Sequence, residues 1–150
     1  MSQIRQRLPH TRKSITHKFV IYSKPVEVIC TSCKKHTVLD ETKTVEVYVT
    51  VGLFENGQPG EVFIKLKHYG DTIKGFADQW AIVVSIALQH GIPVEVICAK
   101  GVHSRFAPSG YTDEVIYDSN GKLAGRSNAT SIIDYVCRWL LKTFPKEGQE

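Results

Sequence analysis

Cys30 and Cys33, separated by two residues, form the motif in this sequence with the most defined chemistry. Two thiols one short turn apart can share a metal ion or close a reversible disulfide. A structural zinc ion needs four ligands, so this pair supplies half of a site, and His36 is the candidate third ligand. Cys98 or Cys137 would join only if folding brings it near, and otherwise a second chain could complete the set. Zinc binding, a redox-active dithiol and two ordinary thiols all remain open from the sequence.

Two polar stretches combine cations, hydroxyl groups and backbone amides in a way that suits a phosphate or a carboxylate. The first covers residues 12–18 and the second covers residues 103–110. If folding brings them together they form an anion-binding pocket, and otherwise they are a basic arm and a surface loop that never meet. The candidate ligand-binding residues are Arg12, Lys13, His17, His103, Arg105 and Ser109.

No arrangement of side chains selects a catalytic site. Nucleophilic catalysis needs a cysteine or serine near a histidine and an orienting acid, and the spacing of these residues picks out no such triad. Gly57 and Gly60 lie in a hairpin turn rather than between a strand and a helix, which argues against a phosphate-binding loop. We therefore assign no catalytic residues.

The charge of the chain is unevenly distributed. The net charge is +4, yet residues 1–24 contain six basic side chains and no acidic one. The rest of the chain has 13 basic and 15 acidic side chains, a net charge of −2. A basic N-terminal arm, residues 1–14, suits contact with phosphate, nucleic acid or a carboxylate-rich partner, although a solvated or docking tail is the simpler interpretation.

Length and composition indicate one globular domain. The chain has 150 residues, of which 42% are hydrophobic and 23% are charged. Four cysteines are too few for the disulfide framework of a small secreted protein. No apolar run approaches the ~18 residues of a membrane span, and the polar first residues do not resemble a signal peptide. We expect a cytoplasmic protein without membrane contact.

The first half of the chain has the patterns of strands. Residues 15–21 and 26–29 are rich in β-branched and aromatic side chains, which predicts a strand with a break at Pro25. Residues 45–53 alternate strictly between apolar and polar side chains, and residues 61–66 supply a returning strand after a turn-forming segment.

Helical periodicity begins after Gly70. One broad apolar face runs from Ile73 to Leu88 and includes Phe76 and Val83, with Asp71 or Thr72 as the cap. A short second helix over residues 93–101 is favoured over a strand, and a final helix is expected over residues 128–143. Residues 106–112 are expected to form a loop and residues 118–121 a turn.

Together these elements predict an α+β fold, a small antiparallel β-sheet packed against two or three α-helices. Cys98 and Cys137 are expected to be buried thiols in its core. Trp80 and Trp139 are also expected to be core residues, but an exposed apolar strip on either of their helices would favour a homodimer.

Several stretches resemble one known family, the C-terminal domain of adenosylcobalamin-dependent (class II) ribonucleotide reductases. This domain is called TSCPD after a cysteine-containing motif. The resemblance runs in order along nearly the whole chain and includes the loop His-Ser-Arg-Phe-Ala-Pro-Ser-Gly at residues 103–110. The matching stretches are residues 7–19, 51–64, 81–93, 103–112 and 131–140.

The chain departs from the family in two places. Residues 23–44, which contain the Cys30 and Cys33 pair, look like an insertion, and the terminal Thr-Ser-Cys-Pro-Asp motif is absent. The redox role of C-terminal cysteines in such reductases is therefore not carried over. The thiyl-radical cysteine of the family lies in a separate barrel that this sequence does not contain, and no adenosylcobalamin site is identifiable in it.

The resemblance implies a single domain over residues 1–150 that acts as an accessory module of ribonucleotide reduction. Such a module would bind a nucleotide or a reductase subunit. Two alternatives stay open: Cys30 and Cys33 form a dithiol that passes electrons to a reductase, or the protein sequesters a small nucleotide independently of any reductase.

Overall fold

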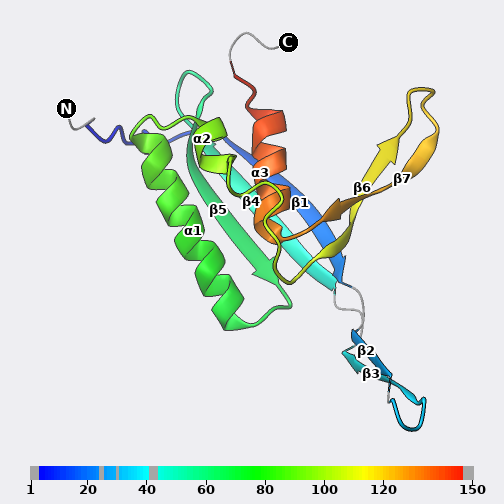
Figure 1. The fold of residues 1–150 in the computed structure, drawn as a ribbon. Coiled ribbons are helices and arrows are strands. Elements are labelled where there is room, and N and C mark those ends of the chain that lie inside the picture. Colours follow the sequence, from blue (N-terminus) through cyan, green and yellow to red (C-terminus); the bar gives the residue numbers. More distant parts are fainter. Residues whose placement is uncertain (1–3, 24–25, 30, 41–43, 147–150) are drawn as a thin grey trace.

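A computed structural model of the chain describes residues 4–23, 26–29, 31–40 and 44–146. Its main element is a five-stranded antiparallel sheet with the strand order β5-β4-β1-β6-β7 (Figure 1). The strands are β1 (Ser14–Ser23), β4 (Thr44–Leu53), β5 (Pro59–Lys67), β6 (Gly110–Tyr117) and β7 (Leu123–Ala129). With the helices described below, this confirms the predicted α+β fold.

The central strand pair follows directly from the alternation seen in the sequence. Val45, Val47, Val49 and Val51 of β4 are all completely buried, because every second side chain of a strand points to the same face. β1 lies antiparallel to β4, with Phe19 opposite Val47, so its own buried side chains join the same core.

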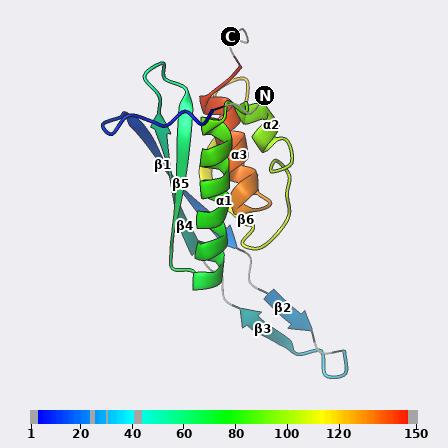
Figure 2. The ribbon, with the colours of Figure 1, turned by 90° about the vertical axis from the view of Figure 1, so that its left-hand side faces the viewer.

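The three helices all lie on one face of the sheet (Figure 2). They are α1 (Asp71–Gln89), α2 (Val94–Cys98) and α3 (Ile132–Thr143). α1 packs against β5, and α3 lies over β1, where Tyr135 stacks on Phe19 with 3.9 Å between ring centroids. The short helix α2 confirms the helix expected after Pro93.

A second, two-stranded sheet is formed by β2 (Val26–Ile29) and β3 (His36–Asp40). β1 ends at Ser23, and the strand that begins at Val26 pairs with β3 instead of extending the main sheet. Pro25, where the break was predicted, lies outside the described residues.

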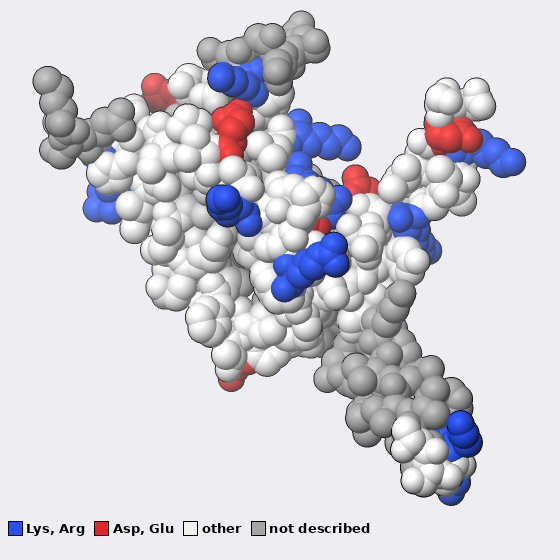
Figure 3. Space-filling view, in the orientation of Figure 1, with Lys and Arg blue, Asp and Glu red and all other residues white. Residues whose placement is uncertain are grey.

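The face that α1 buries differs from the prediction. Ala77, Ala81 and Val84 face the core, whereas Phe76 is 74% exposed and Val83 is also exposed. The apolar residues cover more of the helix circumference than the sheet can bury, so periodicity alone did not identify the buried side. The surface over α1 accordingly shows few charges (Figure 3). An exposed apolar strip on this helix is the condition under which we predicted a homodimer. The oligomeric state itself stays a prediction.

Helix α1 also begins differently. Its N-cap is Gly70, which makes no side-chain cap hydrogen bond, so neither Asp71 nor Thr72 caps the helix. α3 starts at Ile132 rather than at residue 128, because β7 continues to Ala129 and Ser131 is the N-cap that accepts a hydrogen bond from the Asp134 backbone N–H.

The hairpin of β6 and β7 was not predicted. The expected turn at residues 118–121 connects these strands, and part of the expected loop at 106–112 is already strand from Gly110 onward. β6 passes close to β1 at this glycine, where a Cβ atom would lie 2.1 Å from the Tyr22 carbonyl oxygen. Only glycine fits such an approach.

One further expectation is confirmed, because Cys98 and Cys137 are completely buried core thiols. Trp80 and Trp139 were expected to be core residues, but both are only partly buried and pack against the core from outside. In the part of the chain that the structure describes, no helix combines the length and the apolar character needed to cross a membrane.

Candidate functional site

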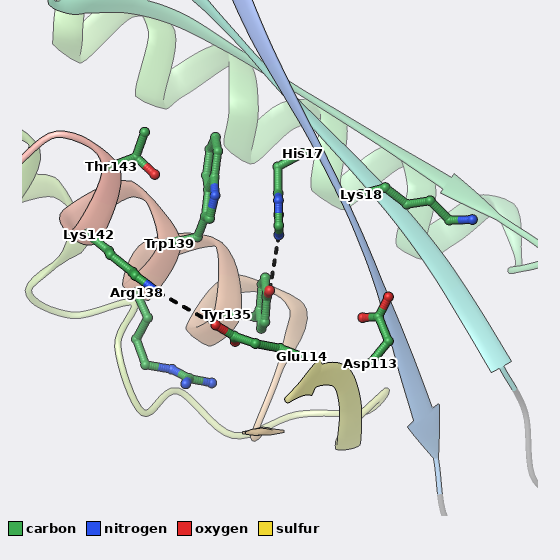
Figure 4. Close-up of a pocket in the computed structure, with 9 residues that line it drawn as sticks. All are labelled: His17, Lys18, Asp113, Glu114, Tyr135, Arg138, Trp139, Lys142 and Thr143. Carbon is green, nitrogen blue, oxygen red and sulfur yellow. Dashed lines mark hydrogen bonds and ion pairs between the residues drawn. The ribbon is translucent and has the colours of Figure 1, made fainter. Parts of the chain in front are cut away.

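A polar cleft of about 500 Å³ opens where α3 lies over β1 and β6, and we call it the α3 cleft (Figure 4). α3 contributes side chains spaced three and four residues apart, which places them on one side of the helix. The cleft is lined by His17, Lys18, Asp113, Glu114, Tyr135, Arg138, Trp139, Lys142 and Thr143.

His17 is the centre of the cleft. It lies on the helix-covered face of β1, and its ring is nearly parallel to that of Trp139, with 5.1 Å between centroids and 13° between planes. Its Nε2 atom is 3.1 Å from the hydroxyl oxygen of Tyr135, and Figure 4 shows the three rings side by side. Partial burial lowers the pKa of His17, although the charges of Glu114 and Asp113 oppose this shift. The imidazole is therefore largely neutral at neutral pH.

The Tyr135 hydroxyl stays protonated. Burial, the nearby charges of Glu114 and Asp113, and a hydrogen bond to Glu114 all raise its pKa. A protonated hydroxyl beside a neutral imidazole gives the cleft hydrogen-bonding groups that carry no charge.

Two cations from α3 border the cleft. The Arg138 guanidinium donates to Asp134 Oδ2 at 2.9 Å and to the Asn128 carbonyl oxygen at 2.7 Å, so it is held in place. The Lys142 side chain is 80% exposed, and its Nζ atom lies 3.9 Å from Glu114 Oε1. Lys18 differs, because its side chain points away from the other lining residues (Figure 4) and pairs with Glu46.

Asp134 joins α3 to the loop that follows α2. This buried carboxylate accepts hydrogen bonds from the backbone N–H groups of His103 at 2.7 Å and Thr130 at 3.2 Å. Burial alone would raise the pKa of Asp134, but the bonds from Arg138 and these two N–H groups lower it below its ordinary value. The ionised carboxylate thus positions both Arg138 and the loop.

Of the six predicted ligand-binding residues, only His17 lines the α3 cleft. Arg12 pairs with Glu61, and the Lys13 carbonyl accepts a hydrogen bond from the Leu53 backbone. These positions lie at the start of β1, away from the loop at 103–109.

That loop contains the other three predicted residues. The side chain of His103 is 82% exposed, while its backbone is bound to Asp134. Arg105 and Ser109 are also exposed. No contact that the structure describes joins the basic arm to this loop, so the anion pocket proposed from both stretches stays a prediction.

The predicted metal ligands lie on the two-stranded sheet or outside the described residues. Cys33 is exposed in the turn between β2 and β3, and His36 is the first residue of β3. Cys30 lies outside the described residues. Within those described, no group of three or more His, Cys, Asp or Glu side chains could hold a metal ion. Zinc binding therefore stays a prediction.

Sequence reasoning missed most of the cleft. Tyr135, Arg138 and Lys142 recur at helical spacing, and this spacing was the available signal, but their helix was interpreted only as a core element. Asp113 and Glu114 offered no signal, because they reach the cleft only through the pairing of β6 with β1.

The comparisons with known proteins agree on one family. The model of the family described as "TSCPD domain" matches residues 17–144. The chain is 39% identical over 140 residues to a protein from Rhodopirellula baltica named vitamin B12-dependent ribonucleotide reductase, covering 93% of this chain and 11% of that protein. Proteins of the same name from Streptantibioticus cattleyicolor and Bradyrhizobium diazoefficiens are 31% and 28% identical, over 94% and 93% of this chain.

The chain spans only a small part of these relatives, 18% of the Streptantibioticus cattleyicolor protein and 9% of the Bradyrhizobium diazoefficiens protein. No solved structure matches the chain.

Proposed function

Because the chain belongs to the TSCPD domain family, whose members include part of vitamin B12-dependent ribonucleotide reductases, we propose that it is an accessory module of ribonucleotide reduction that binds a nucleotide in the α3 cleft. The observation that carries this proposal is the parallel pair of His17 and Trp139 rings beside the cations of α3. The module would present the nucleotide to a reductase subunit or sense its concentration.

The aromatic part of the cleft suits a nucleobase. Bases stack on aromatic side chains, a contact worth about 1–3 kcal/mol per base. The neutral His17 ring and the protonated Tyr135 hydroxyl add uncharged hydrogen-bonding groups next to the stack. Such groups can pair with the polar edge of a base without introducing a buried charge.

The charged part suits the rest of a nucleotide. Lys142 is exposed and Arg138 is held by Asp134, so both can donate to phosphate oxygens. Asp113 and Glu114 lie opposite and can accept from ribose hydroxyls or from an exocyclic amino group. Since Glu114 already attracts Lys142, a bound phosphate would replace an existing ion pair rather than meet an unpaired cation.

The test is calorimetric titration of the purified chain with ribonucleotides and deoxyribonucleotides, in the absence of any reductase. Lys142→Ala should weaken binding about tenfold, or about 1.5 kcal/mol, because it removes a charge-assisted bond. The matched control is Lys122→Ala in the hairpin between β6 and β7, which removes the same charge away from the α3 cleft. Equal affinity of the two variants, or no binding by the parent chain, would contradict the proposal.

A parallel titration separates the role in reduction from independent nucleotide sequestration. Adding a B12-dependent reductase from a related organism should change the affinity for the nucleotide if the module serves that enzyme, because two linked binding events alter each other equally. Unchanged affinity, together with tight binding by the chain alone, would favour sequestration.

As a second candidate function, we propose that Cys30 and Cys33 form a dithiol that passes electrons to a reductase. The supporting observation is that Cys33 is exposed at the turn of a separate hairpin. As a dithiol, Cys30 and Cys33 would react quickly with a thiol reagent whether or not a chelator is present. As zinc ligands they would be protected until the chelator removes the metal.

A further inference from the structure

The sheet has a second face that no described helix covers, and we call it the open face (Figure 2). Its side chains come from the positions that alternate with the buried ones on β1, β4 and β5. A hollow of about 600 Å³ lies at the β5 edge of the sheet, lined by open-face side chains and by Lys74 and Asp78 of α1. The open-face residues used below are Thr16, Lys18, Tyr48, Phe63, Lys65 and Lys67.

The strand register arranges these side chains in rows. Lys18 lies opposite Tyr48, which in turn lies opposite Lys65. In the neighbouring row Thr16 lies opposite Thr50, which lies opposite Phe63. Diagonal neighbours in adjacent rows of an antiparallel pair are about 7–8 Å apart. Tyr48 and Phe63 are such diagonal neighbours, and both line the hollow together with Lys65 and Lys67.

Phe63 is the side chain that core packing does not explain. It is 51% exposed, whereas its strand neighbours Val62 and Ile64 are buried. β5 is an edge strand of the sheet, and a large apolar ring on its solvent-facing side gains little stability from burial and is available to a planar ligand.

Tyr48 holds two of the cations. Lys18 Nζ and Lys67 Nζ lie 5.7 Å and 5.2 Å from the centre of its ring, and both ammonium groups also contact Glu46. These contacts keep the lysine side chains on the open face.

The open face is positively charged overall. Lys18, Lys65 and Lys67 on the strands outnumber the carboxylates of Glu46 and Glu61 on the same face, and Glu61 is paired with Arg12. At the other end of β1 the same features recur, because Tyr22 lies opposite Tyr111 and the Arg126 guanidinium lies 5.6 Å from the centre of the Tyr22 ring.

We propose that the open face binds single-stranded nucleic acid. Proteins that bind single strands combine a positively charged surface along the phosphate backbone with aromatic side chains on which bases stack. Phe63 would be the stacking platform, and Lys18, Lys65 and Lys67 would contact phosphates. A second copy of this face is a poorer occupant, because it would bring lysines against lysines.

This site is separate from the α3 cleft except at Lys18. Phe63, Lys65 and Lys67 do not line the cleft, and the Lys18 side chain borders it but points away from the other lining residues. Loss of one binding activity therefore leaves the other measurable.

The test is fluorescence anisotropy of the full chain with a labelled 15-nucleotide oligothymidylate and, separately, oligouridylate in low salt. Phe63→Ala should weaken binding fivefold or more, the loss expected for one stacked base. The matched control is Phe76→Ala, which removes an even more exposed phenyl ring from α1 on the other side of the sheet. Equal affinities of the two variants would overturn the proposal, as would no binding by the parent chain.

Salt dependence tests the lysines. Three phosphate contacts on a single strand predict a slope of about −2 in log K against log salt concentration, and Lys65→Ala with Lys67→Ala should reduce its magnitude by about 1.4. The control pair is Lys100→Ala with Lys122→Ala. Heparin supplies a polyanion without bases, and the proposal fails if heparin binds as tightly as the oligonucleotide and Phe63→Ala affects neither. It also fails if the parent chain dimerises through this face, seen as a dimer that Phe63→Ala dissociates.

Discussion

The two faces of the central sheet show how one strand can serve two purposes. On the face under the helices, Phe19 and Ile21 of β1 are buried and pack with the valines of β4. On the open face, Lys18 of the same strand forms an ion pair and a contact with an aromatic ring. The covered face therefore supplies the free energy of folding, and the open face is free to carry binding chemistry.

His17 is the exception that locates the α3 cleft. It lies on the covered face in line with Phe19, yet it is only half-buried and its ring stacks on Trp139. The core ends at this position, so the covered face changes from apolar packing to a polar cleft within two residues of β1.

The largest expected effect on the free energy of unfolding comes from removing a buried side chain of the covered face. Phe19→Ala should lower the free energy of unfolding by about 3–5 kcal/mol, because it removes a fully buried ring that stacks on Tyr135. The matched control is Phe63→Ala on the open face, which should cost about 1 kcal/mol or less. Urea denaturation of the two variants measures the difference. Similar losses would mean that the two faces do not differ as described.

A smaller loss of unfolding free energy is expected when Asp134, which links α3 to the loops before it, is replaced. Asp134→Ala should lower the free energy of unfolding by about 2–4 kcal/mol, because it leaves the N–H groups of His103 and Thr130 and the Arg138 guanidinium without their acceptor. Thermal or urea denaturation at pH 7 measures it.

Asp71→Ala is the control for this change, since Asp71 lies in the first turn of α1 without a cap hydrogen bond. The pH dependence offers a second check. Because the folded-state pKa of Asp134 is lowered, its contribution is present above the unfolded pKa and is lost as the pH falls through the folded pKa. An equal cost for both aspartates would show that the hydrogen bonds of Asp134 contribute little.

His17 should make stability depend weakly on pH. Its folded-state pKa lies below the ordinary value of 6.5, so between these two pH values the unfolded chain binds a proton that the folded chain does not. The free energy of unfolding should fall as the pH drops from about 6.5 toward the lowered pKa. Above about 6.5 the neutral His17 ring should no longer make it depend on pH. The effect is small because the ring is partly solvated. His17→Phe should remove this part of the pH profile, as thermal midpoints from pH 5 to 8 would show.

The sequence predicted the covered face better than either candidate site. The alternation of Val45 to Val51 specifies one buried side of a strand without reference to the rest of the chain, and the structure confirms it. The α3 cleft instead joins His17 to Tyr135, 118 positions later, through the docking of α3 on β1. Local periodicity contains no information on such a contact.

The β6–β7 hairpin shows the same limit. Its turn at residues 118–121 was predicted, but the strands on either side were not, because Val115, Ile116 and Tyr117 are consecutive exposed residues rather than an alternating series. With the hairpin unrecognised, Asp113 and Glu114 could not be placed beside His17.

The smallest expected effect is on the open face. Lys18→Ala should leave the denaturation midpoint within error of the parent chain, because solvent screens its ion pair with Glu46 and ordering two exposed side chains costs entropy. The same variant should weaken oligonucleotide binding, since Lys18 is one of the proposed phosphate contacts. Unchanged stability with reduced binding would separate the two faces most directly. A clear loss of stability would instead assign Lys18 to the fold and weaken the argument that the open face is kept for a ligand.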